Sequence, residues 1–263
     1  MRCVDAKHVR SVRGRTPSLT PRKSSAIRYD WATVTKRILL VDCYVDEPGA
    51  AQTFGAFVAP DRMHVARATH RRLDENVGEY GAVIISGSAA AIVDPPAWAA
   101  PLEDLVRDAA ERDVPLLGVC FGHQIIARAL YGRDTVRESA RAELGWLELD
   151  RHGDDPLFEG VERRFRVFCS HLEEVANLPD EVEVLAGSAD CAVHAFRIRG
   201  SRMWGVQFHA EMTLDEARLL VRDKARKYPD RGIDVDETLS HATDTRDLAQ
   251  SVIDNFLAQA ELG

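Results

Sequence analysis

Apolar residues form short continuous runs in the first half of the chain, each about the length of a buried strand. Such runs predict strands that are covered on both faces, as in a parallel sheet. Between them, residues 98–112 alternate apolar and charged side chains at helical spacing, and a further helix is predicted at 125–131. The predicted strands of this half are 37–42, 64–69, 82–85 and 114–119.

The second half of the chain is richer in strand signals and ends in two predicted helices. Strands that alternate with helices, followed by a run of strands, indicate an α/β fold. We therefore predict a doubly wound, mostly parallel sheet with flanking helices and a small antiparallel β portion. The later strands are predicted at 147–149, 165–169, 182–185, 193–198 and 203–208, the helices at 213–227 and 245–260, and a polar loop at 228–244.

Charge is unevenly distributed along the chain. Residues 1–36 contain nine Lys or Arg and two acidic residues, a net charge of +7, whereas the remainder contains 25 basic and 40 acidic residues, a net charge of -15. The first segment also lacks apolar periodicity, which predicts a disordered basic arm over residues 1–35. An organelle transit peptide and a misassigned start codon are the alternatives. Residues 36–263 are predicted to form one domain with a C-terminal helical tail.

The overall composition favours a globular protein of the cytoplasm. The 263 residues carry a net charge of -8, unlike the basic face that nucleic-acid binding requires. No apolar run in the sequence approaches the roughly 20 residues that cross a bilayer, so no membrane association is expected. The five cysteines are widely spaced without a C-x-x-C pair, so they predict neither a disulfide framework nor a zinc site, and they suit a reducing compartment.

One cysteine lies where a predicted buried strand meets a helix. Cys120 is flanked by Gly118 and Gly122, which allow a tight strand-to-helix turn. Such a turn lifts the sulfur out of the sheet, and the positive N-terminal end of the following helix stabilises a thiolate. The backbone N–H of Phe121 would point at an oxyanion formed beside the sulfur. Cys120 is thus a candidate nucleophile, and the alternative is a buried structural cysteine.

A histidine and a glutamate follow a later predicted strand, with one residue between them. His209 and Glu211 point to the same side if the chain is extended there. A cysteine nucleophile needs a base, and the ring of that base needs a group that orients it. We predict that His209 is the base and Glu211 its orienting partner. Taken singly, the two residues would be a satisfied strand-end histidine and a solvated charge.

The two motifs together resemble class I (triad) glutamine amidotransferases. In that family the first motif reads G-x-C-x-G-x-Q, and the second commonly reads G-V-Q-F-H-P-E. This chain matches the first motif completely and departs from the second at Ala210, where proline would stiffen the turn between the base and its partner. The resemblance spans nearly all of residues 37–260 and is greatest for the stand-alone, GMP-synthase-like branch. It implies a flavodoxin-like sheet.

The resemblance also implies roles for further residues. Gly87 matches the glycine whose N–H completes the oxyanion hole, and Gln124 matches the elbow glutamine that helps to hold the substrate. Ser170 and His171 match a substrate-binding turn, although the pattern alone fits a polar strand-to-loop turn equally well. Family members often have Asp shortly after this turn, where Glu173 stands here, so the amino-acid end of the substrate is expected to be gripped differently.

The activity that the resemblance implies is hydrolysis of the side-chain amide of glutamine. The Cys120 thiolate would form a γ-glutamyl thioester and release ammonia, without a metal or an organic cofactor. No P-loop accompanies the motifs in the sequence, so an ammonia-accepting synthase subunit is the expected partner. A γ-glutamyl peptidase or hydrolase that acts without a partner, and a non-catalytic binding or regulatory relative, are the alternatives. The pocket near Ser170 to Glu173 separates the first two, because a closed pocket fits glutamine and an open one admits a γ-glutamyl peptide.

Overall fold

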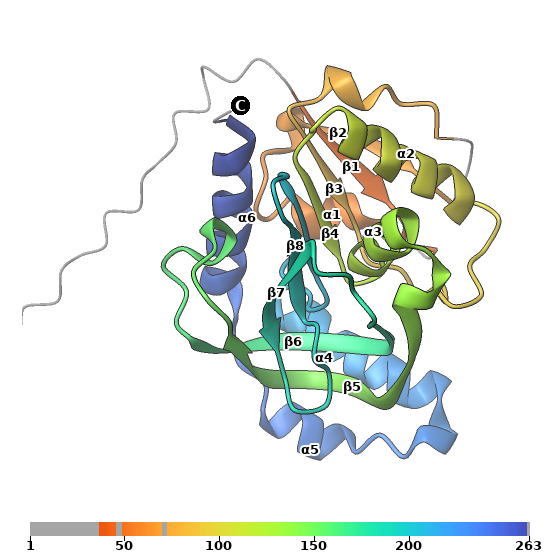
Figure 1. Ribbon diagram of the computed structural model, residues 1–263. Helices are drawn as coiled ribbons and strands as arrows, with labels where there is room; N and C mark the ends of the chain where they lie inside the picture. Colours follow the sequence, from red (N-terminus) through yellow and green to blue (C-terminus); the bar gives the residue numbers. More distant parts are fainter. Residues whose placement is uncertain (1–36, 46–48, 70–72, 262–263) are drawn as a thin grey trace, which may run out of the picture. The chain divides into compact units, whose positions relative to one another are not determined.

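The strands of the described residues join into one sheet (Figure 1). The computed structural model describes residues 37–45, 49–69 and 73–261, so the predicted arm over residues 1–35 lies outside the described residues. Within these ranges the sheet has nine strands in the order β2-β1-β3-β4-β9-β8-β7-β5-β6. The chain thus builds the sheet outward on both sides of β1 and then returns to place β9 beside β4.

The first five strands of that order run parallel to their neighbours. Every residue of the four inner ones is buried, which explains why their sequences are nearly continuous apolar runs. The predicted parallel sheet is therefore confirmed. Its strands are β2 (Met63–Arg67), β1 (Ile38–Asp42), β3 (Ala82–Ile85), β4 (Leu116–Val119) and β9 (Met203–Val206).

Helices cover both faces of the parallel strands, as a doubly wound fold requires. Helices α2 (Ala99–Glu111) and α3 (Phe121–Tyr131) bury their apolar side chains in the core on one face. Helices α1 (Ala50–Phe54) and α6 (Arg246–Glu261) do so on the other face, where Phe54 and Phe256 are fully buried. Alternate residues of one strand, such as Leu39 and Leu40, accordingly belong to different cores.

The antiparallel portion is larger than predicted. Strands β8 (Ala195–Ile198), β7 (Val182–Gly187), β5 (Val136–Arg151) and β6 (Arg164–Val175) continue the sheet beyond β9. Strand β5 has 16 residues, of which only 147–149 were predicted as strand. Its first half is mostly exposed and consists largely of Arg, Glu, Ser and Ala residues, so hydrophobic periodicity does not reveal it.

Two further helices pack beside the antiparallel strands. Helix α4 (Leu214–Lys227) begins with a capping box at Thr213 and Glu216, and its apolar side chains meet Trp146 and Phe168 of β5 and β6. Helix α5 (Val235–Ser240) lies within the segment predicted as a polar loop. No helix among the described residues combines the length and apolar character needed to cross a membrane.

Candidate active site

Three neighbouring strands bring the main candidate residues to one edge of the sheet. Strands β3, β4 and β9 lie side by side and run parallel. Gly87, Cys120 and His209 each follow the carboxyl end of one of these strands within three residues. Because parallel strands present their carboxyl ends at the same edge, the three residues meet there although they are far apart in sequence.

Cys120 occupies a strained turn between β4 and α3. Its backbone has φ 53° and ψ −102°, a positive φ that residues other than glycine rarely adopt. The Cys120 N–H donates to the carbonyl of Val206 at 2.8 Å, which fastens the turn to β9. A side chain at Gly118 would overlap the backbone of Gly122, and one at Gly122 would overlap the carbonyl of Ile85. The two glycines therefore permit the close approach of helix and strand that the turn needs.

His209 and Glu211 form a buried pair next to the sulfur. His209 Nδ1 lies 2.8 Å from Glu211 Oε1, and the ring is also within hydrogen-bonding reach of the Cys120 side chain. The exposed fractions are 5 % for Cys120, 6 % for His209 and 0 % for Glu211. The His209 N–H donates to the carbonyl of Phe168 at 2.9 Å, so β6 holds the backbone of this turn without the usual proline.

The pKa of His209 is set by opposing effects. Burial lowers it, but the charges of Glu211 and Cys120 and the hydrogen bonds to both side chains outweigh burial and raise the pKa to about 10. The imidazole is therefore protonated at neutral pH when the cysteine is a thiolate. An imidazolium between a thiolate and a carboxylate is the arrangement that activates a cysteine nucleophile.

Tyr44 belongs to the same cluster, although the sequence analysis did not single it out. Its Oη donates to Glu211 Oε1 at 3.2 Å, the same oxygen that His209 contacts. Tyr44 comes two residues after β1, at the edge where the other candidates lie. The one signal in the sequence that could have identified Tyr44 is an aromatic hydroxyl two residues after the end of a parallel strand.

Gly87 lies against Cys120 and His209. A Cβ added at Gly87 would stand 3.2 Å from His209 Cε1 and 3.5 Å from Cys120 Cβ. Phe121 is the first residue of α3, where backbone N–H groups have no partner within the helix. The two residues predicted for an oxyanion hole therefore flank Cys120, one on the loop after β3 and one on the elbow helix.

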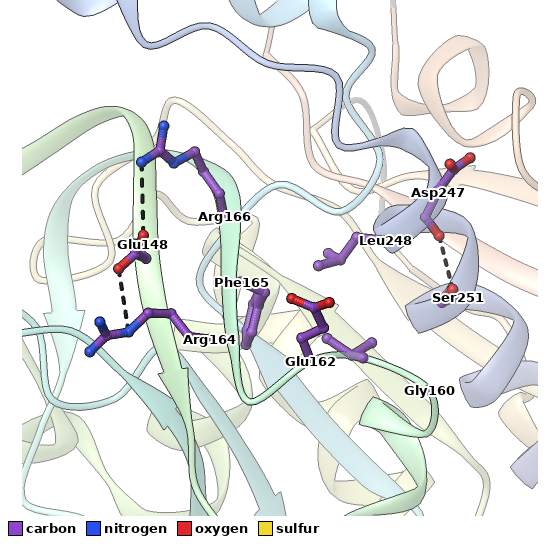
Figure 2. A pocket seen from close by; sticks show the side chains of 10 residues that line it. Glu148, Gly160, Glu162, Arg164, Phe165, Arg166, Asp247, Leu248 and Ser251 are labelled. Carbon is purple, nitrogen blue, oxygen red and sulfur yellow. Dashed lines mark hydrogen bonds and ion pairs between the residues drawn. The ribbon is translucent and has the colours of Figure 1, made fainter. Parts of the chain in front are cut away.

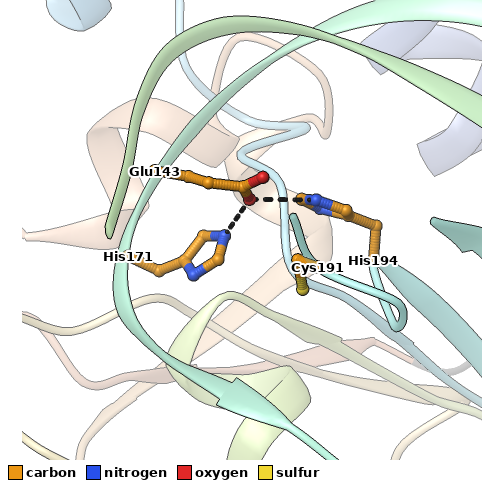
Figure 3. Close-up of side chains that lie close together, drawn as sticks. All are labelled: Glu143, His171, Cys191 and His194. Carbon is orange, nitrogen blue, oxygen red and sulfur yellow. Dashed lines mark hydrogen bonds and ion pairs between the residues drawn. The ribbon is translucent and has the colours of Figure 1, made fainter. Parts of the chain in front are cut away.

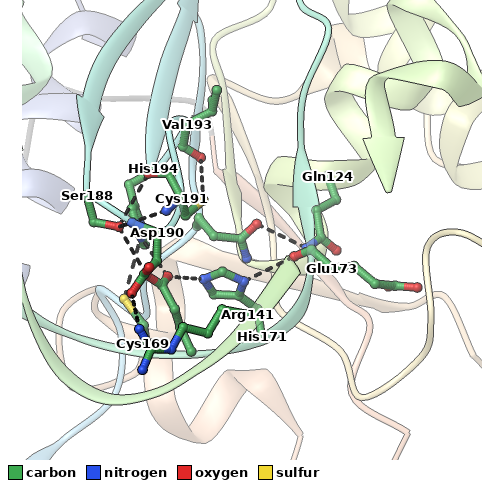
Figure 4. A network of polar contacts seen from close by, with 12 residues as sticks. Gln124, Arg141, Cys169, His171, Glu173, Ser188, Asp190, Cys191, Val193 and His194 are labelled. Atoms are coloured by element: carbon green, nitrogen blue, oxygen red, sulfur yellow. Dashed lines mark hydrogen bonds and ion pairs between the residues drawn. The ribbon is translucent and has the colours of Figure 1, made fainter. Parts of the chain in front are cut away.

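Gln124 is engaged within the protein (Figure 4). Its Nε2 donates to the carbonyl of Glu173 at 2.7 Å and to Gln207 Oε1 at 3.0 Å. These bonds tie the elbow helix α3 to β6 and to the segment that leads into His209. The amide nitrogen of Gln124 is thus placed to position the walls of the site.

Glu173 links β6 to the loop that follows Gly87. Its carboxylate accepts the N–H of Ile92 at 2.6 Å and the N–H of Val93 at 3.2 Å. A shorter aspartate at this position would reach less far along that loop. The side chain that departs from the family pattern therefore holds the loop that follows Gly87.

Ser170 and His171 point in different directions, because neighbouring residues of a strand face opposite sides. The Ser170 carbonyl lies 3.9 Å from Cys120 Sγ. The His171 ring instead contacts Glu143 Oε2 at 2.7 Å. A cavity of about 360 Å³ adjoins both residues. It is lined by Ala142, Glu143, Leu144, Ser170, His171, Leu172, Lys224, Tyr228, Arg231 and Ile233.

A second cavity lies apart from these residues (Figure 2). It has a volume of about 470 Å³ and lies between β5, β6 and the start of α6, where Arg164 and Arg166 contact Glu148. Its lining residues include none of the candidates predicted from the sequence. The chemistry therefore concentrates at the carboxyl edge of the parallel strands.

The chain combines a doubly wound sheet, a cysteine on a strained strand-to-helix turn and a His–Glu pair that follows the adjacent strand. This combination is typical of α/β proteins with a cysteine-centred triad. The family model for glutamine amidotransferase class-I matches residues 57–227, and the chain belongs to this family. The predicted family is therefore confirmed.

Curated relatives support the GMP-synthase-like branch. The chain is 37 % identical over 114 residues to a glutamine-hydrolyzing GMP synthase subunit of Pyrococcus abyssi, a match that covers 43 % of this chain and 60 % of that protein. It is 40 % identical over 100 residues to the corresponding subunit of Methanothermobacter thermautotrophicus, covering 38 % of this chain and 53 % of that protein. The matches thus span little more than half the length of these relatives.

Solved structures share the fold. A glutamine amidotransferase from Thermotoga maritima has a TM-score of 0.72 at 19 % identity, covering 86 % of this chain and 97 % of that chain. A glutamine amidotransferase from Methylobacillus flagellatus has a TM-score of 0.66 at 21 % identity, covering 85 % of this chain and 94 % of that chain. The likeness establishes a common α/β architecture.

Proposed function

We propose that this protein hydrolyses the side-chain amide of glutamine and releases ammonia for a synthase partner. The observation that carries the proposal is a buried cluster in which His209 contacts Glu211 and lies beside Cys120, which occupies a strained turn. Membership of the glutamine amidotransferase class-I family supports the choice of substrate.

The first half of the reaction forms a thioester. The Cys120 thiolate attacks the amide carbon of glutamine, and the carbonyl oxygen becomes an oxyanion that the N–H groups of Gly87 and Phe121 stabilise. The tetrahedral intermediate collapses, the C–N bond breaks, and His209 gives its proton to the leaving nitrogen. Ammonia departs and the γ-glutamyl group remains on the sulfur.

The second half releases glutamate. His209, now neutral, takes a proton from a water molecule, and the resulting hydroxide attacks the thioester carbon. The C–S bond breaks, the thiolate is restored beside the imidazolium, and glutamate leaves. Glu211 keeps the Nδ1 side of the ring occupied throughout, so that Nε2 is the atom that exchanges protons with the reactants.

The partner and the compartment are part of the same proposal. Both of these relatives are named as subunits of a glutamine-hydrolyzing GMP synthase. We therefore propose that a second protein uses the ammonia that this chain releases. We place the reaction in the cytoplasm, where a reducing environment keeps Cys120 as a thiol. The described cysteines Cys43, Cys120, Cys169 and Cys191 are all free.

The test is glutamate release by the purified full chain from glutamine and, separately, from γ-glutamyl dipeptides. Release from glutamine that is lost in Cys120→Ala and kept in Cys43→Ala, a change at another buried cysteine, is the expected result. Rapid release from the dipeptides with glutamine ignored would instead identify a γ-glutamyl hydrolase. A chain that releases glutamate from neither substrate, and in which a glutamine-derived affinity label leaves Cys120 unmodified, would contradict both activities.

A further inference from the structure

Four side chains with metal-binding atoms meet inside the antiparallel portion of the sheet (Figure 3). Glu143 lies on β5 and His171 faces it from β6, while Cys191 and His194 come from the loop between β7 and β8. One ligand atom from each of the four lies within 4.8 Å of all the others. All four residues are buried, and the triad makes no use of them.

The His171 ring is oriented toward the cluster. Its Nδ1 lies 3.1 Å from the carbonyl oxygen of Glu173, which only accepts, so Nδ1 donates there. The opposite ring nitrogen, Nε2, lies 2.7 Å from Glu143 Oε2 and therefore faces the cluster.

His194 directs a ring nitrogen at the same carboxylate. Its side chain is 0 % exposed, and its Nε2 lies within ion-pair distance of Glu143 Oε2, at 3.0 Å. This contact does not have the geometry of a hydrogen bond, and the nitrogen has no other hydrogen-bond partner among the described residues. A fully buried ring nitrogen without a hydrogen-bond partner is unusual, and this one is directed into a cluster that already holds a carboxylate and a thiol.

We propose that Glu143, His171, Cys191 and His194 bind a structural Zn²⁺ ion. Two imidazole nitrogens, one thiolate and one carboxylate oxygen are ligands that zinc prefers, and four protein ligands complete a closed tetrahedral site. The charges also balance, because the thiolate and the carboxylate together neutralise the ion. Binding displaces the thiol proton of Cys191 and any proton held between His171 and Glu143, and these protons pass to the solvent.

The surroundings meet the further requirements of such a site. The carbonyl of Glu173 holds the outer nitrogen of His171, which fixes the ring for ligation through Nε2. Ser188 Oγ donates to Glu143 Oε1 at 3.0 Å and so orients the carboxylate. The cavity of about 360 Å³ reaches Glu143 and His171 and offers an access route. Tetrahedral zinc ligands stand about 3.3 Å apart, so Glu143 would move by roughly half an ångström from both rings.

The ligands come from separate segments, which explains why the sequence analysis predicted no zinc site. Glu143 follows a register irregularity in β5, so its pairing with His171 does not follow from counting residues. The ion would join the β7–β8 loop to β6, and the neighbouring Ser170 carbonyl contacts the nucleophile. We therefore assign the ion the role of holding β6 in place beside Cys120.

The first test measures metal directly in the full chain. The purified protein is stripped with a chelator, equilibrated with buffered Zn²⁺ and analysed by mass spectrometry for metal content. About one zinc per chain is expected. Replacement of zinc by Co²⁺ is expected to give the intense thiolate-to-cobalt absorption band of a tetrahedral site with a sulfur ligand. Neither readout depends on glutaminase activity, so failure of this proposal is distinguishable from failure of the proposed function.

The variants assign the ligands. Cys191→Ser is expected to weaken Zn²⁺ binding by more than about tenfold, measured by competition with a chromophoric chelator, and to abolish the cobalt band. Cys43→Ser changes another buried cysteine outside the cluster and is expected to leave both unchanged. The proposal is overturned if the unmodified chain takes up no zinc and shows no cobalt band, or if Cys191→Ser binds zinc as tightly as the unmodified chain. The wild-type measurements decide the matter even where a variant fails to fold.

Discussion

Tyr44 donates a hydrogen bond to the Glu211 oxygen that also holds the ring of His209. The hydroxyl thus holds the Glu211 carboxylate, which orients the ring of His209 beside Cys120. Tyr44 is a positioning residue in this arrangement, since it acts on the base through the carboxylate. The four side chains come from the loops after β1, β4 and β9, three strands of the same parallel set.

Removal of this hydroxyl is expected to slow the reaction without unfolding the protein. Tyr44→Phe removes one hydrogen bond to a buried carboxylate, so kcat should fall by roughly three- to tenfold with KM nearly unchanged. The measurement is steady-state glutaminase kinetics beside Tyr80→Phe, a tyrosine that packs against His64. A rise in KM alone, with kcat retained, would argue against a positioning role.

The pH profile is expected to report the raised pKa of His209. The proposed reaction needs a protonated imidazole when ammonia leaves, so activity should decline as pH rises through about 10. In Glu211→Gln the carboxylate charge is lost, the pKa of His209 falls, and the alkaline decline should move to lower pH. The rate should also fall on the order of a hundredfold or more, because the ring loses its charged partner.

The same group links stability to pH. The folded pKa of His209, about 10, lies above its ordinary value of 6.5, so its stabilising contribution is complete below pH 6.5 and is lost as pH rises toward 10. The free energy of unfolding, measured with urea at several pH values, checks this dependence in the unmodified chain and in Glu211→Gln. Glu138→Gln, a change at an exposed position of β5, is the control. An alkaline limit that stays in place in Glu211→Gln would show that another group titrates.

The Glu173 carboxylate is expected to hold the loop that contains Ile92 and Val93 in place. Glu173→Ala removes the acceptor for the N–H groups of Ile92 and Val93, so both amides should exchange with deuterium faster and KM for glutamine should rise several-fold. Glu174→Ala is the matched control, because this neighbouring side chain pairs with Arg137 instead. Unchanged exchange at residues 92 and 93 would contradict the anchoring role.

Two glycines at the site are expected to respond differently to alanine. In Gly122→Ala the new methyl group overlaps the Ile85 carbonyl, so the free energy of unfolding should fall by about 1–3 kcal/mol. In Gly87→Ala the methyl group stands 3.2 Å from the His209 ring, so kcat should fall by more than about tenfold while stability changes little. Thermal unfolding and kinetics on both variants separate the two effects, and a stable, fully active Gly87→Ala would contradict the tight contact between residue 87 and the His209 ring.

The parallel half of the fold was predictable from local signals, and the meeting of Cys120 with His209 was predictable from the family pattern. Continuous apolar runs identify buried parallel strands, and the carboxyl ends of such strands share one edge. The residues directly after β4 and β9 therefore had to lie near each other once those strands were known to be neighbours. The family pattern supplied that neighbourhood, which periodicity alone does not contain.

The rest of the site depends on tertiary contacts that no spacing reveals. Tyr44 reaches Glu211 across 167 positions of the chain, and the Glu173 carboxylate reaches Ile92 across 81. Ser170 and His171 were both predicted to lie in a substrate-binding turn, and the alternation of β6 turns their side chains to opposite sides, which the sequence motif does not reveal. Strand β5 was largely missed because its first half is mostly exposed and makes few apolar contacts. This half is held in the sheet by its pairing with β6.

The positive φ of Cys120 lowers the stability of the fold at the residue that supplies the proposed nucleophile. A side chain at φ 53° and ψ −102° carries a backbone strain of about 1–3 kcal/mol that glycine would relieve. Cys120→Gly should therefore unfold at a higher temperature than Cys120→Ala, although both lack the nucleophile. A descendant of this chain that lost the need for the reaction would become more robust by giving up its cysteine, so a strained cysteine persists here only as long as its sulfur is in use.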